Sequence, residues 1–366
     1  MKYYIISGEA SGDLHGSNLI RQLHLQDLHA DIRCWGGDLM EQAGATLVKH
    51  YRDLAFMGFA EVVANLPTIF KNIRFCKEDI LAFQPDVLVL IDYPGFNLRM
   101  AEWAKKEGIK VVYYISPQVW AWKANRVKKM KQCIDLMLCI LPFEKDYYRD
   151  KWNWDVEYVG HPLVEVIDQS MDHGPWTMDK NIIALLPGSR KQEISKKLPI
   201  MLEVAKSFPE YQFVVAQAPG LDNEFYAPFM APYQNVSSVQ NKTYDLLLKA
   251  KAALVTSGTA TLETALFGVP EIVCYKGSNV SYQIAKRLIK IKYISLVNLI
   301  MDKLVVKELI QDELTTANLV KELGLLLTDE SRKTELVNDY THLKALLAAG
   351  GHASAQAAKK IVAMIS

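Results

Sequence analysis

Short apolar runs alternate with segments of helical periodicity along most of this chain. The clearest run spans residues 86–92, where apolar residues follow one another almost without interruption. Such runs are typical of strands that are buried on both faces of a parallel sheet. Parallel strands need crossover connections, which are usually helical and right-handed. The pattern therefore predicts an α/β protein built from doubly wound parallel sheets.

The alternation occurs twice, on either side of an aperiodic stretch at residues 151–180 that we interpret as a linker. In the first half we expect strands at 2–6, 31–35, 45–50, 86–92, 110–115 and 135–141, and helices after the first strand, over most of 58–83 and at 98–106. In the second half we expect strands at 181–186, 211–216, 251–256 and 271–275, and helices at 191–208, 259–267 and 353–365. The sequence predicts two Rossmann-like domains facing a central cleft: residues 1–165, completed by the C-terminal helix at 345–366, and residues 166–344.

Composition excludes several classes of protein. The formal net charge is +1, so the chain lacks the overall basic character that attracts nucleic acid. The five cysteines are scattered without C-x-x-C spacing, which argues against a disulfide framework and a zinc site and favours reduced thiols. There is no secretory signal, and no apolar run approaches the ~18 residues of a membrane-spanning helix. We therefore expect a cytoplasmic protein.

The residues after the first strand combine glycines with ionisable side chains. Residues 7–16 contain three glycines together with Glu9, Asp13 and His15. We expect a glycine-rich loop before the first helix, because glycine permits tight turns. The glycines stand four residues apart and do not form G-x-G-x-x-G, which argues against a nicotinamide-dependent oxidoreductase. Crowded carboxylates and an imidazole favour proton chemistry, although Asp13 equally fits a cap of the first helix.

Another carboxylate, Asp92, ends the run of residues 86–92. Because the carboxyl ends of parallel strands meet at one edge of a sheet, Asp92 and the side chains of the opening loop should reach the cleft together. An acidic residue at the end of a buried strand is as often structural, held by backbone N–H groups. We interpret His161 mainly as a linker residue. His15 is the more suggestive histidine, because imidazole is a common general base near neutral pH.

Two strand-to-helix junctions in the second half are suited to anions. Residues 186–190 (LPGSR) and 256–263 (TSGTATLE) each follow a strand and precede a helix, where free backbone N–H groups favour phosphates. At the first junction, glycine permits close approach and Arg190 offers bidentate contact. Each motif alone also fits an ordinary turn and helix cap. Together they predict a nucleotide diphosphate site formed by Gly188, Ser189, Arg190, Ser257, Gly258, Thr259, Thr261 and Glu263.

One segment of the first half mixes apolar and basic residues. Residues 66–75 (LPTIFKNIRF) have the composition of a helix at a membrane interface, and residues 126–131 (RVKKMK) add a basic run. On composition alone, the better interpretation is that the apolar residues face the core and the charges face water.

Six motifs together resemble the lipid-A-disaccharide synthase family. They occur in the family's order and comprise residues 7–13 (SGEASGD), 116–122 (SPQVWAW), 141–144 (LPFE), 160–162 (GHP), 186–190 (LPGSR) and 257–263 (SGTATLE). The resemblance implies a GT-B fold and an inverting transfer from UDP-2,3-diacylglucosamine to the 6-hydroxyl of 2,3-diacylglucosamine 1-phosphate. The implied products are the β(1→6) disaccharide 1-phosphate and UDP. The resemblance also implies a peripheral protein at the cytoplasmic face of the inner membrane of Gram-negative bacteria, which favours a membrane role for residues 66–75.

The resemblance implies roles for individual residues. We expect Asp92 to be the general base, with Glu9 and His15 as orienting or alternative groups. Related sequences often carry a second acid where this chain has Gly95, so no role of that acid carries over. Asn298, Glu308 and Gln311 match family positions near the uridine and ribose. Candidates on the acceptor side or in the cleft are Ser11, Gly12, Asp13, Asn97, Ser116, Gln118 and Trp120.

The expected partners are the two acylated sugars, the inner-membrane surface and a second copy of the chain in a homodimer. No cofactor or metal is expected, because Arg190 and the helix N-termini can stabilise the leaving diphosphate. One alternative is another UDP-sugar enzyme of the same fold, such as a 2-epimerase or a peptidoglycan-precursor transferase. Such enzymes need a different acceptor site, and the motif at residues 116–122 does not suit them. A non-catalytic, membrane-associated nucleotide binder is a further alternative, but it leaves Glu9, His15 and Asp92 without a purpose.

Overall fold

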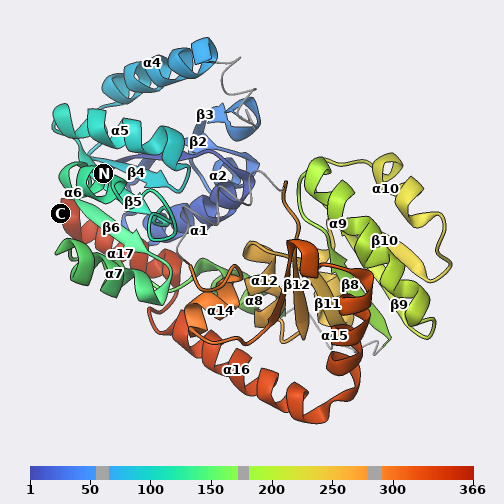
Figure 1. Cartoon of the computed structure of the whole chain (residues 1–366). Coiled ribbons are helices and arrows are strands. Elements are labelled where there is room, and N and C mark those ends of the chain that lie inside the picture. Colours follow the sequence, from blue (N-terminus) through green and yellow to red (C-terminus); the bar gives the residue numbers. More distant parts are fainter. Residues whose placement is uncertain (55–65, 172–180, 279–290) are drawn as a thin grey trace. The chain divides into compact units, whose positions relative to one another are not determined.

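The computed structural model describes residues 1–54, 66–171, 181–278 and 291–366 and divides into two compact units (Figure 1). The first unit contains Met1–Pro162 and Leu347–Ser366, and the second contains Leu163–Leu346. Each unit has its own all-parallel sheet flanked by helices. The predicted α/β class, with two Rossmann-like doubly wound sheets, is confirmed.

The first unit is built on a seven-stranded sheet of order β3-β2-β1-β4-β5-β6-β7. Its strands are β1 (Lys2–Ser7), β2 (Asp31–Gly36), β3 (Thr46–His50), β4 (Val87–Ile91), β5 (Lys110–Tyr114), β6 (Leu136–Cys139) and β7 (Glu157–Tyr158). Its helices are α1 (Ala10–Gln26), α2 (Asp38–Gln42), η1 (Tyr51–Leu54), α4 (Leu66–Phe83), α5 (Pro94–Lys106), α6 (Arg126–Cys133), α7 (Pro142–Trp152) and α17 (Ala353–Ile365). The strand order reverses between β1 and β4, and ligands of open α/β sheets bind at such a point.

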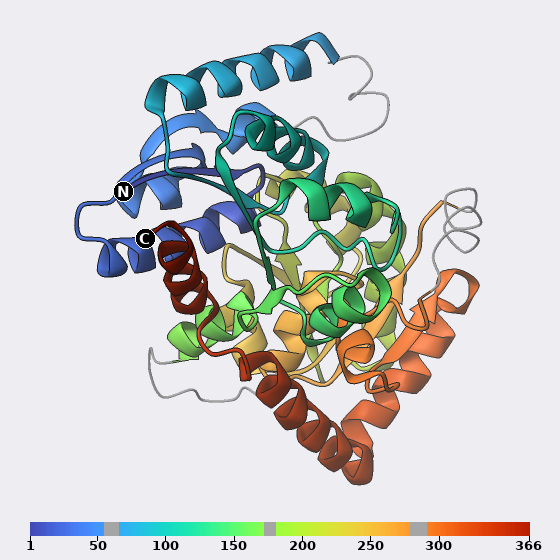
Figure 2. The ribbon, with the colours of Figure 1, turned by 90° about the vertical axis from the view of Figure 1, so that its left-hand side faces the viewer.

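Burial on both faces explains why the central strands are continuously apolar. Tyr4 and Leu88 pack in one cluster with residues of α4, α5, α6 and α7. Their neighbours Tyr3 and Val87 pack in a second cluster with residues of α1 and α17. The C-terminal helix α17 lies along α1, as both views show (Figure 2), so the end of the chain covers one face of the first sheet.

The second unit is built on a six-stranded sheet of order β10-β9-β8-β11-β12-β13. Its strands are β8 (Ile182–Leu186), β9 (Gln212–Gln217), β10 (Val236–Gln240), β11 (Ala250–Thr256), β12 (Glu271–Tyr275) and β13 (Lys307–Ile310). The helices are α8 (Pro162–Met171), α9 (Lys191–Glu203), η2 (Val204–Ser207), α10 (Asn223–Met230), α11 (Thr243–Lys249), α12 (Thr259–Leu266), α14 (Leu296–Met301), η3 (Gln311–Glu313), α15 (Thr316–Thr328) and α16 (Glu330–Ala348). Here the order reverses between β8 and β11, so the two predicted anion motifs follow the central strands.

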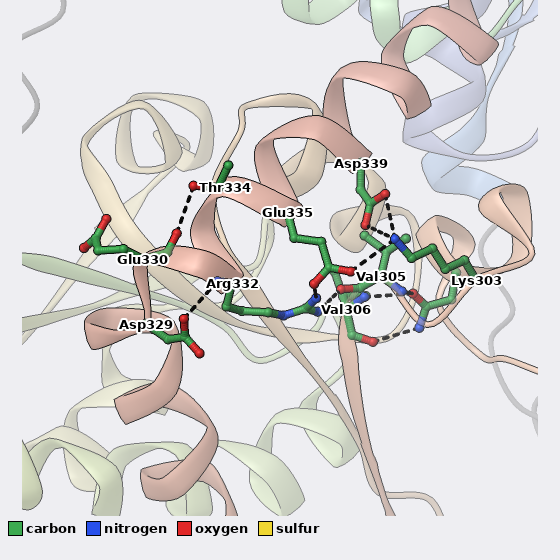
Figure 3. Close-up of polar contacts among 10 residues, drawn as sticks. Lys303, Val305, Val306, Asp329, Glu330, Arg332, Thr334, Glu335 and Asp339 are labelled. Carbon is green, nitrogen blue, oxygen red and sulfur yellow. Dashed lines mark hydrogen bonds and ion pairs between the residues drawn. The ribbon is translucent and has the colours of Figure 1, made fainter.

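Polar contacts attach α16 to the segment that precedes β13 (Figure 3). Lys303 Nζ lies 2.8 Å from Asp339 and 3.2 Å from Glu335. The guanidinium of Arg332 donates a hydrogen bond to the carbonyl oxygen of Val305. Exposed ion pairs contribute little individually, but together these contacts fix the loop that enters β13.

The opening glycines are the first correction to the sequence predictions. Helix α1 begins at Ala10, so Gly12 and Gly16 lie inside a helix and not in a loop. A Cβ at Gly12 would lie 2.8 Å from the Cβ of Ser7, and one at Gly16 would lie 2.7 Å from Met40 Sδ. These glycines therefore permit close packing of α1 against its neighbours. A tight turn is not their role.

The stretch at residues 151–180 is a second correction. It was predicted to lack regular structure, but β7 and all of α8 lie within it, and residues 172–180 lie outside the described residues. Strands β10 and β13 were not predicted. β10 (VSSVQ) has few apolar residues and only intermediate burial, and β13 is four residues long. Neither strand has the continuous apolar run that marks a strand in the centre of a sheet.

Candidate active site

The chain turns sharply where β4 ends, at the reversal point of the first sheet. Asp92 and Tyr93 have φ angles of 44° and 48°, in the left-handed region that residues other than glycine rarely enter. The carbonyl oxygen of Asp92 accepts hydrogen bonds from the Tyr113 hydroxyl at 2.6 Å and from Asn97 Nδ2 at 2.8 Å. These two side chains bind the main chain of the turn and do not contact the Asp92 carboxyl group through these bonds.

The carboxyl group of Asp92 is suited to accept a proton near neutral pH. Burial raises its pKa to about 6, the negative charge of Glu9 adds to this effect, and a hydrogen bond from the Tyr93 N–H opposes it. A carboxylate held mainly by backbone N–H groups would have a lowered pKa. The upward shift therefore favours a general base over a purely structural residue.

Close packing brings Glu9 toward Asp92. A Cβ at Gly8 would lie 2.4 Å from the ring of Tyr93, so glycine is needed where β1 passes into α1. Glu9 is the N-cap residue of α1, has an extended backbone and is exposed. The first unit thus pairs a half-buried carboxyl group with an exposed one at the carboxyl ends of β1 and β4.

His15 and His161 are neighbouring buried residues of the first unit. Burial lowers the pKa of His15 to about 4. Burial, with a further effect of His15, lowers the pKa of His161 to about 3. Both imidazoles are therefore neutral at pH 7, and His15 is a weaker base than Asp92. His161 lies one residue before the end of the segment Met1–Pro162, as expected of a linker residue, but its side chain is buried and its N–H donates to the carbonyl oxygen of Leu347.

Asp13 caps a helix, but not the one predicted. Its carboxylate accepts backbone hydrogen bonds at the start of α2, from Gly37 at 2.9 Å, Met40 at 3.0 Å and Leu39 at 3.2 Å. Asp13 is buried, and its bonds to Gly37 and Met40 are buried with it, so those two N–H groups have no access to water as a substitute. The side chain joins α1 to the β2–α2 junction.

We expect Asp13→Ala to lower the free energy of unfolding by about 2–3 kcal/mol, because three N–H groups, two of them in buried hydrogen bonds, lose a charged acceptor. Urea unfolding of Asp13→Ala beside Asp31→Ala, an exposed aspartate at the start of β2, checks this expectation. Asp13→Asn should recover part of the loss, since it keeps one acceptor oxygen. Equal unfolding midpoints for Asp13→Ala and Asp31→Ala would contradict the capping role.

The segment at residues 116–122 is anchored to α7 by buried polar groups. Glu144 accepts hydrogen bonds from the Leu141 N–H at 3.1 Å and from Trp120 Nε1 at 3.2 Å, and burial raises its pKa to about 7. The hydroxyl groups of Ser116 and Tyr148 lie 2.7 Å apart. Two of the acceptor-side candidates are therefore held in place by α7.

The remaining acceptor-side candidates differ in exposure. Ser11 and Gln118 are exposed, and Gly12 is buried inside α1. Asn97 is fully buried, and its Nδ2 donates to the carbonyl oxygens that end β1 and β4, at Ile6 and Ile91. Asn97 therefore fixes the strand ends, while Ser11 and Gln118 remain accessible.

In the second unit, a pocket lies at the carboxyl ends of β8, β9 and β11. Its volume is about 330 Å³, and its lining includes six predicted residues, Gly188, Ser189, Ser257, Gly258, Thr259 and Glu263. Gly188 and Gly258 have φ angles of 117° and 151°, which favour glycine. The first turns of α9 and α12 border the pocket, so their free N–H groups are available to an anion.

Arg190 stands beside this pocket without lining it. It is the N-cap residue of α9, and its side chain is 66% exposed. The nearest carboxylate is Glu193, at 3.7 Å from Arg190 Nη1. No hydrogen bond between described residues holds the guanidinium, which leaves it available to a ligand.

Thr261 and Glu263 have partners within the chain. Thr261 is fully buried, and its hydroxyl donates to the carbonyl oxygen of Gly258 at 2.8 Å, so it shapes the turn before α12. Glu263 lines the pocket, accepts a hydrogen bond from the Tyr244 hydroxyl at 2.9 Å and has a pKa raised by burial. Only Glu263 of these two can meet a ligand in the pocket.

Asn298, Glu308 and Gln311, which were predicted to lie near the uridine and ribose, do not line the pocket. Asn298 Nδ2 donates to Glu308 Oε1 at 2.9 Å, and the Glu308 carboxylate also accepts from the Ile294 N–H at 3.1 Å. The carbonyl oxygen of Ile294 accepts from the pocket residue Ser257 at 3.0 Å. Gln311 Oε1 accepts from the Gly277 N–H at 2.7 Å. The first two residues thus support the pocket through Ile294.

Sequence reasoning missed several pocket residues. Gln217, Thr243 and Glu193 also line the pocket, and Gln217 Nε2 is bound to Asn223 and Ser238. Gln217 directly follows the strand predicted at 211–216, so the rule that ligands bind at carboxyl strand ends could have found it. Thr243 follows strand β10, which has no clear sequence signal. Among the described residues, no group of His, Cys, Asp or Glu side chains is arranged to hold a metal ion.

Comparisons with known proteins give a consistent result. A family model described as lipid-A-disaccharide synthetase matches residues 3–362. The lipid-A-disaccharide synthase of Trichlorobacter lovleyi is 38% identical over 358 residues, which cover 95% of this chain and 93% of that protein. The enzyme of the same name from Coxiella burnetii is 36% identical over 368 residues, covering 98% and 96%.

Solved structures extend the comparison to the fold. The UDP-GlcNAc 2-epimerase of Neisseria meningitidis, bound to UDP-GlcNAc, has a TM-score of 0.67 at 15% identity and covers 100% of this chain and 99% of its own. The glycotransferase of kitacinnamycin has a TM-score of 0.68 at 13% identity, with the same coverage. At such identities these likenesses show the fold alone, which is GT-B.

Proposed function

Because the chain belongs to the lipid-A-disaccharide synthase family, we propose that it joins UDP-2,3-diacylglucosamine to 2,3-diacylglucosamine 1-phosphate. The family makes the chain a hexosyltransferase of lipid A disaccharide synthesis. The proposed products are the β(1→6) disaccharide 1-phosphate and UDP, with inversion at the anomeric carbon.

The observation that carries the proposal is the 330 Å³ pocket bordered by the N-termini of α9 and α12. We assign the donor to this second unit, residues 166–344 in the sequence prediction. Two helix N-termini at one pocket suit the two phosphates of a nucleoside diphosphate. Gly188 and Gly258 permit close approach, and Arg190 can reach the leaving diphosphate from the pocket's edge.

We assign the acceptor to the first unit, with Asp92 as the base. The 6-hydroxyl oxygen forms a bond to the anomeric carbon while the bond from that carbon to the β-phosphate oxygen breaks. The electron pair leaves with UDP, and the hydroxyl proton passes to the Asp92 carboxylate. Glu9 contributes by raising the pKa of Asp92, and Arg190 with the helix N-termini stabilises the charge that develops on UDP.

Helix α4 supports peripheral binding to the cytoplasmic face of the inner membrane. Cys76 lies in the core, whereas Phe70 and Phe75 are 64% and 44% exposed beside exposed Lys71 and Arg74. Exposed aromatic rings next to cations suit an anionic lipid surface. None of the helices in the described ranges combines the length and apolar character needed to cross a bilayer. Acylated substrates would be met at that surface.

Acceptor-dependent release of UDP tests the proposed function. The full chain is incubated with UDP-2,3-diacylglucosamine in detergent, with and without the acceptor, and UDP and lipid products are measured by mass spectrometry. We expect one UDP per disaccharide phosphate and no UDP without acceptor. UDP release that ignores the acceptor, or no disaccharide from protein that binds UDP, would contradict the proposal. Epimerisation of the donor would favour the 2-epimerase alternative.

The pH profile should reflect Asp92. The carboxylate is the active form of a general base, so kcat/KM should fall about tenfold per pH unit below pH ~6 and level off above it. Initial rates between pH 5 and 8 measure this, with circular dichroism to confirm that the protein stays folded. Glu9→Gln removes a negative neighbour and should move the midpoint to lower pH. A flat profile across this range would contradict the assignment.

A further inference from the structure

A groove lies between α5 and α6, which are side by side in Figure 1, and it takes no part in the proposed donor binding or proton transfer. Its volume is about 240 Å³, and it begins at Pro94 and Gly95, directly after the Asp92 turn. Sites for whole small molecules usually measure about 300–1,000 Å³. This groove suits one group of a larger ligand.

The groove carries unpaired positive charge. Arg99, Arg126, Lys129 and Glu102 line it, and Lys129 Nζ is paired with Glu102 at 2.6 Å. Neither guanidinium takes part in a hydrogen bond or ion pair with any residue in the described ranges. Arg126 is half-buried, where a cation without a partner is costly. Two arginines with free forks at one groove are suited to bidentate contact with a phosphate.

The groove is also placed to serve the reaction. Gly95 is three residues from Asp92, so their Cα atoms lie within about 11 Å of each other. A Cβ at Gly95 would meet no atom within 4 Å, so this end of the groove is open. Arg126 lies near enough to affect the phenol of Tyr113, whose pKa is raised by burial and lowered by the arginine. The Tyr113 hydroxyl in turn holds the Asp92 turn.

We propose that this groove holds the phosphate of the acceptor sugar, with Arg99 and Arg126 as its ligands. This inference rests on the proposed function, in which the acceptor carries a phosphate at the anomeric carbon and presents its 6-hydroxyl to Asp92. In the acceptor a single hexose separates the phosphate from the 6-hydroxyl, so binding the phosphate in the groove would set the position of the hydroxyl. The arginines then bind and orient the acceptor and take no part in proton transfer.

Kinetics with two acceptors test the proposal. Arg126→Ala and Arg99→Ala should each lower kcat/KM for 2,3-diacylglucosamine 1-phosphate about tenfold or more, mainly through KM. For 2,3-diacylglucosamine, which lacks the phosphate, they should leave kcat/KM within about twofold of the unchanged chain. Lys128→Ala, which removes an exposed cation of α6 outside the groove, should change neither value. Equal losses with both acceptors, or no loss with either, would overturn the proposal.

Two further measurements distinguish an acceptor-phosphate site from a site for anionic membrane lipid. Sedimentation with vesicles of phosphatidylglycerol or phosphatidylcholine measures attraction to anionic headgroups. If Arg99→Ala and Arg126→Ala bind less well to phosphatidylglycerol vesicles only, and discriminate between the two acceptors as the unchanged chain does, the groove binds membrane lipid. That result would overturn the acceptor assignment. Glucosamine 1-phosphate binding, followed by NMR on the full chain, requires no turnover. If the chain makes no disaccharide, loss of this binding in Arg126→Ala still supports a phosphate site, and unchanged binding overturns it.

Discussion

Asp92→Asn should abolish sugar transfer and at the same time make the protein more stable at pH 7. The amide cannot accept the hydroxyl proton, so turnover falls by at least ~10²-fold, whereas UDP affinity, which depends on the second unit, stays unchanged. Burial and Glu9 raise the pKa of Asp92 to about 6 in the folded protein, compared with about 3.9 in an unfolded chain. The charged form is therefore disfavoured by folding.

The sign of the stability change depends on pH. Because the folded pKa is the higher one, the folded state gains relative stability below about pH 4, and this gain is lost as pH rises through about 6. At pH 7 the substitution should raise the free energy of unfolding by up to about 3 kcal/mol. At pH 4, close to the unfolded pKa, the gain should fall below about 1 kcal/mol. Urea unfolding at both values measures it, and a mutant with normal turnover, or one less stable at pH 7, would contradict the assignment.

Arg190→Ala should lower kcat by about 10²–10³-fold, the usual cost of removing a group that stabilises developing charge. Its side chain is 66% exposed and lies 3.7 Å from its nearest carboxylate, so its removal should change the free energy of unfolding by less than about 0.5 kcal/mol. The measured loss can then be assigned to catalysis. Steady-state kinetics and urea unfolding of the same preparations give both quantities.

A neighbouring cation provides the control for Arg190. Lys196 is exposed on the same helix and does not line the pocket, so Lys196→Ala should leave kcat unchanged. Arg190→Lys keeps the charge but loses the planar fork and should recover only part of the activity. Wild-type turnover in Arg190→Ala would remove this residue from the mechanism.

The elements predicted correctly from the sequence are those whose local pattern fits a single type of structure. The apolar run ending at Asp92 predicted β4, because a short continuous run of this kind is typical of a strand buried on both faces. The pattern of strand, glycine and helix predicted the turns at Gly188 and Gly258, and the structure has both glycines at positive φ in the pocket lining. In these cases, the chemistry of neighbouring residues was sufficient.

Predictions failed where the answer depended on residues far along the chain. Gly12 and Gly16 resemble loop glycines, but their need for space comes from Ser7 and Met40, contacts that no local pattern reveals. Asp13 was expected to cap its own helix or reach the cleft, and its partners are the N–H groups of a different helix, α2. The local sequence thus shows that a glycine or a carboxylate stands at an unusual position, but it does not show which distant residue contacts it.

The stereochemistry of the product tests the central claim most directly. The full chain is incubated with UDP-2,3-diacylglucosamine and 2,3-diacylglucosamine 1-phosphate, and the lipid product is analysed by NMR for linkage position and anomeric configuration. In-line attack on the donor, with Asp92 as base and UDP as leaving group, predicts a single β(1→6) disaccharide 1-phosphate. An α-linked product, hydrolysis of the donor without a disaccharide, or an epimerised donor would contradict the account.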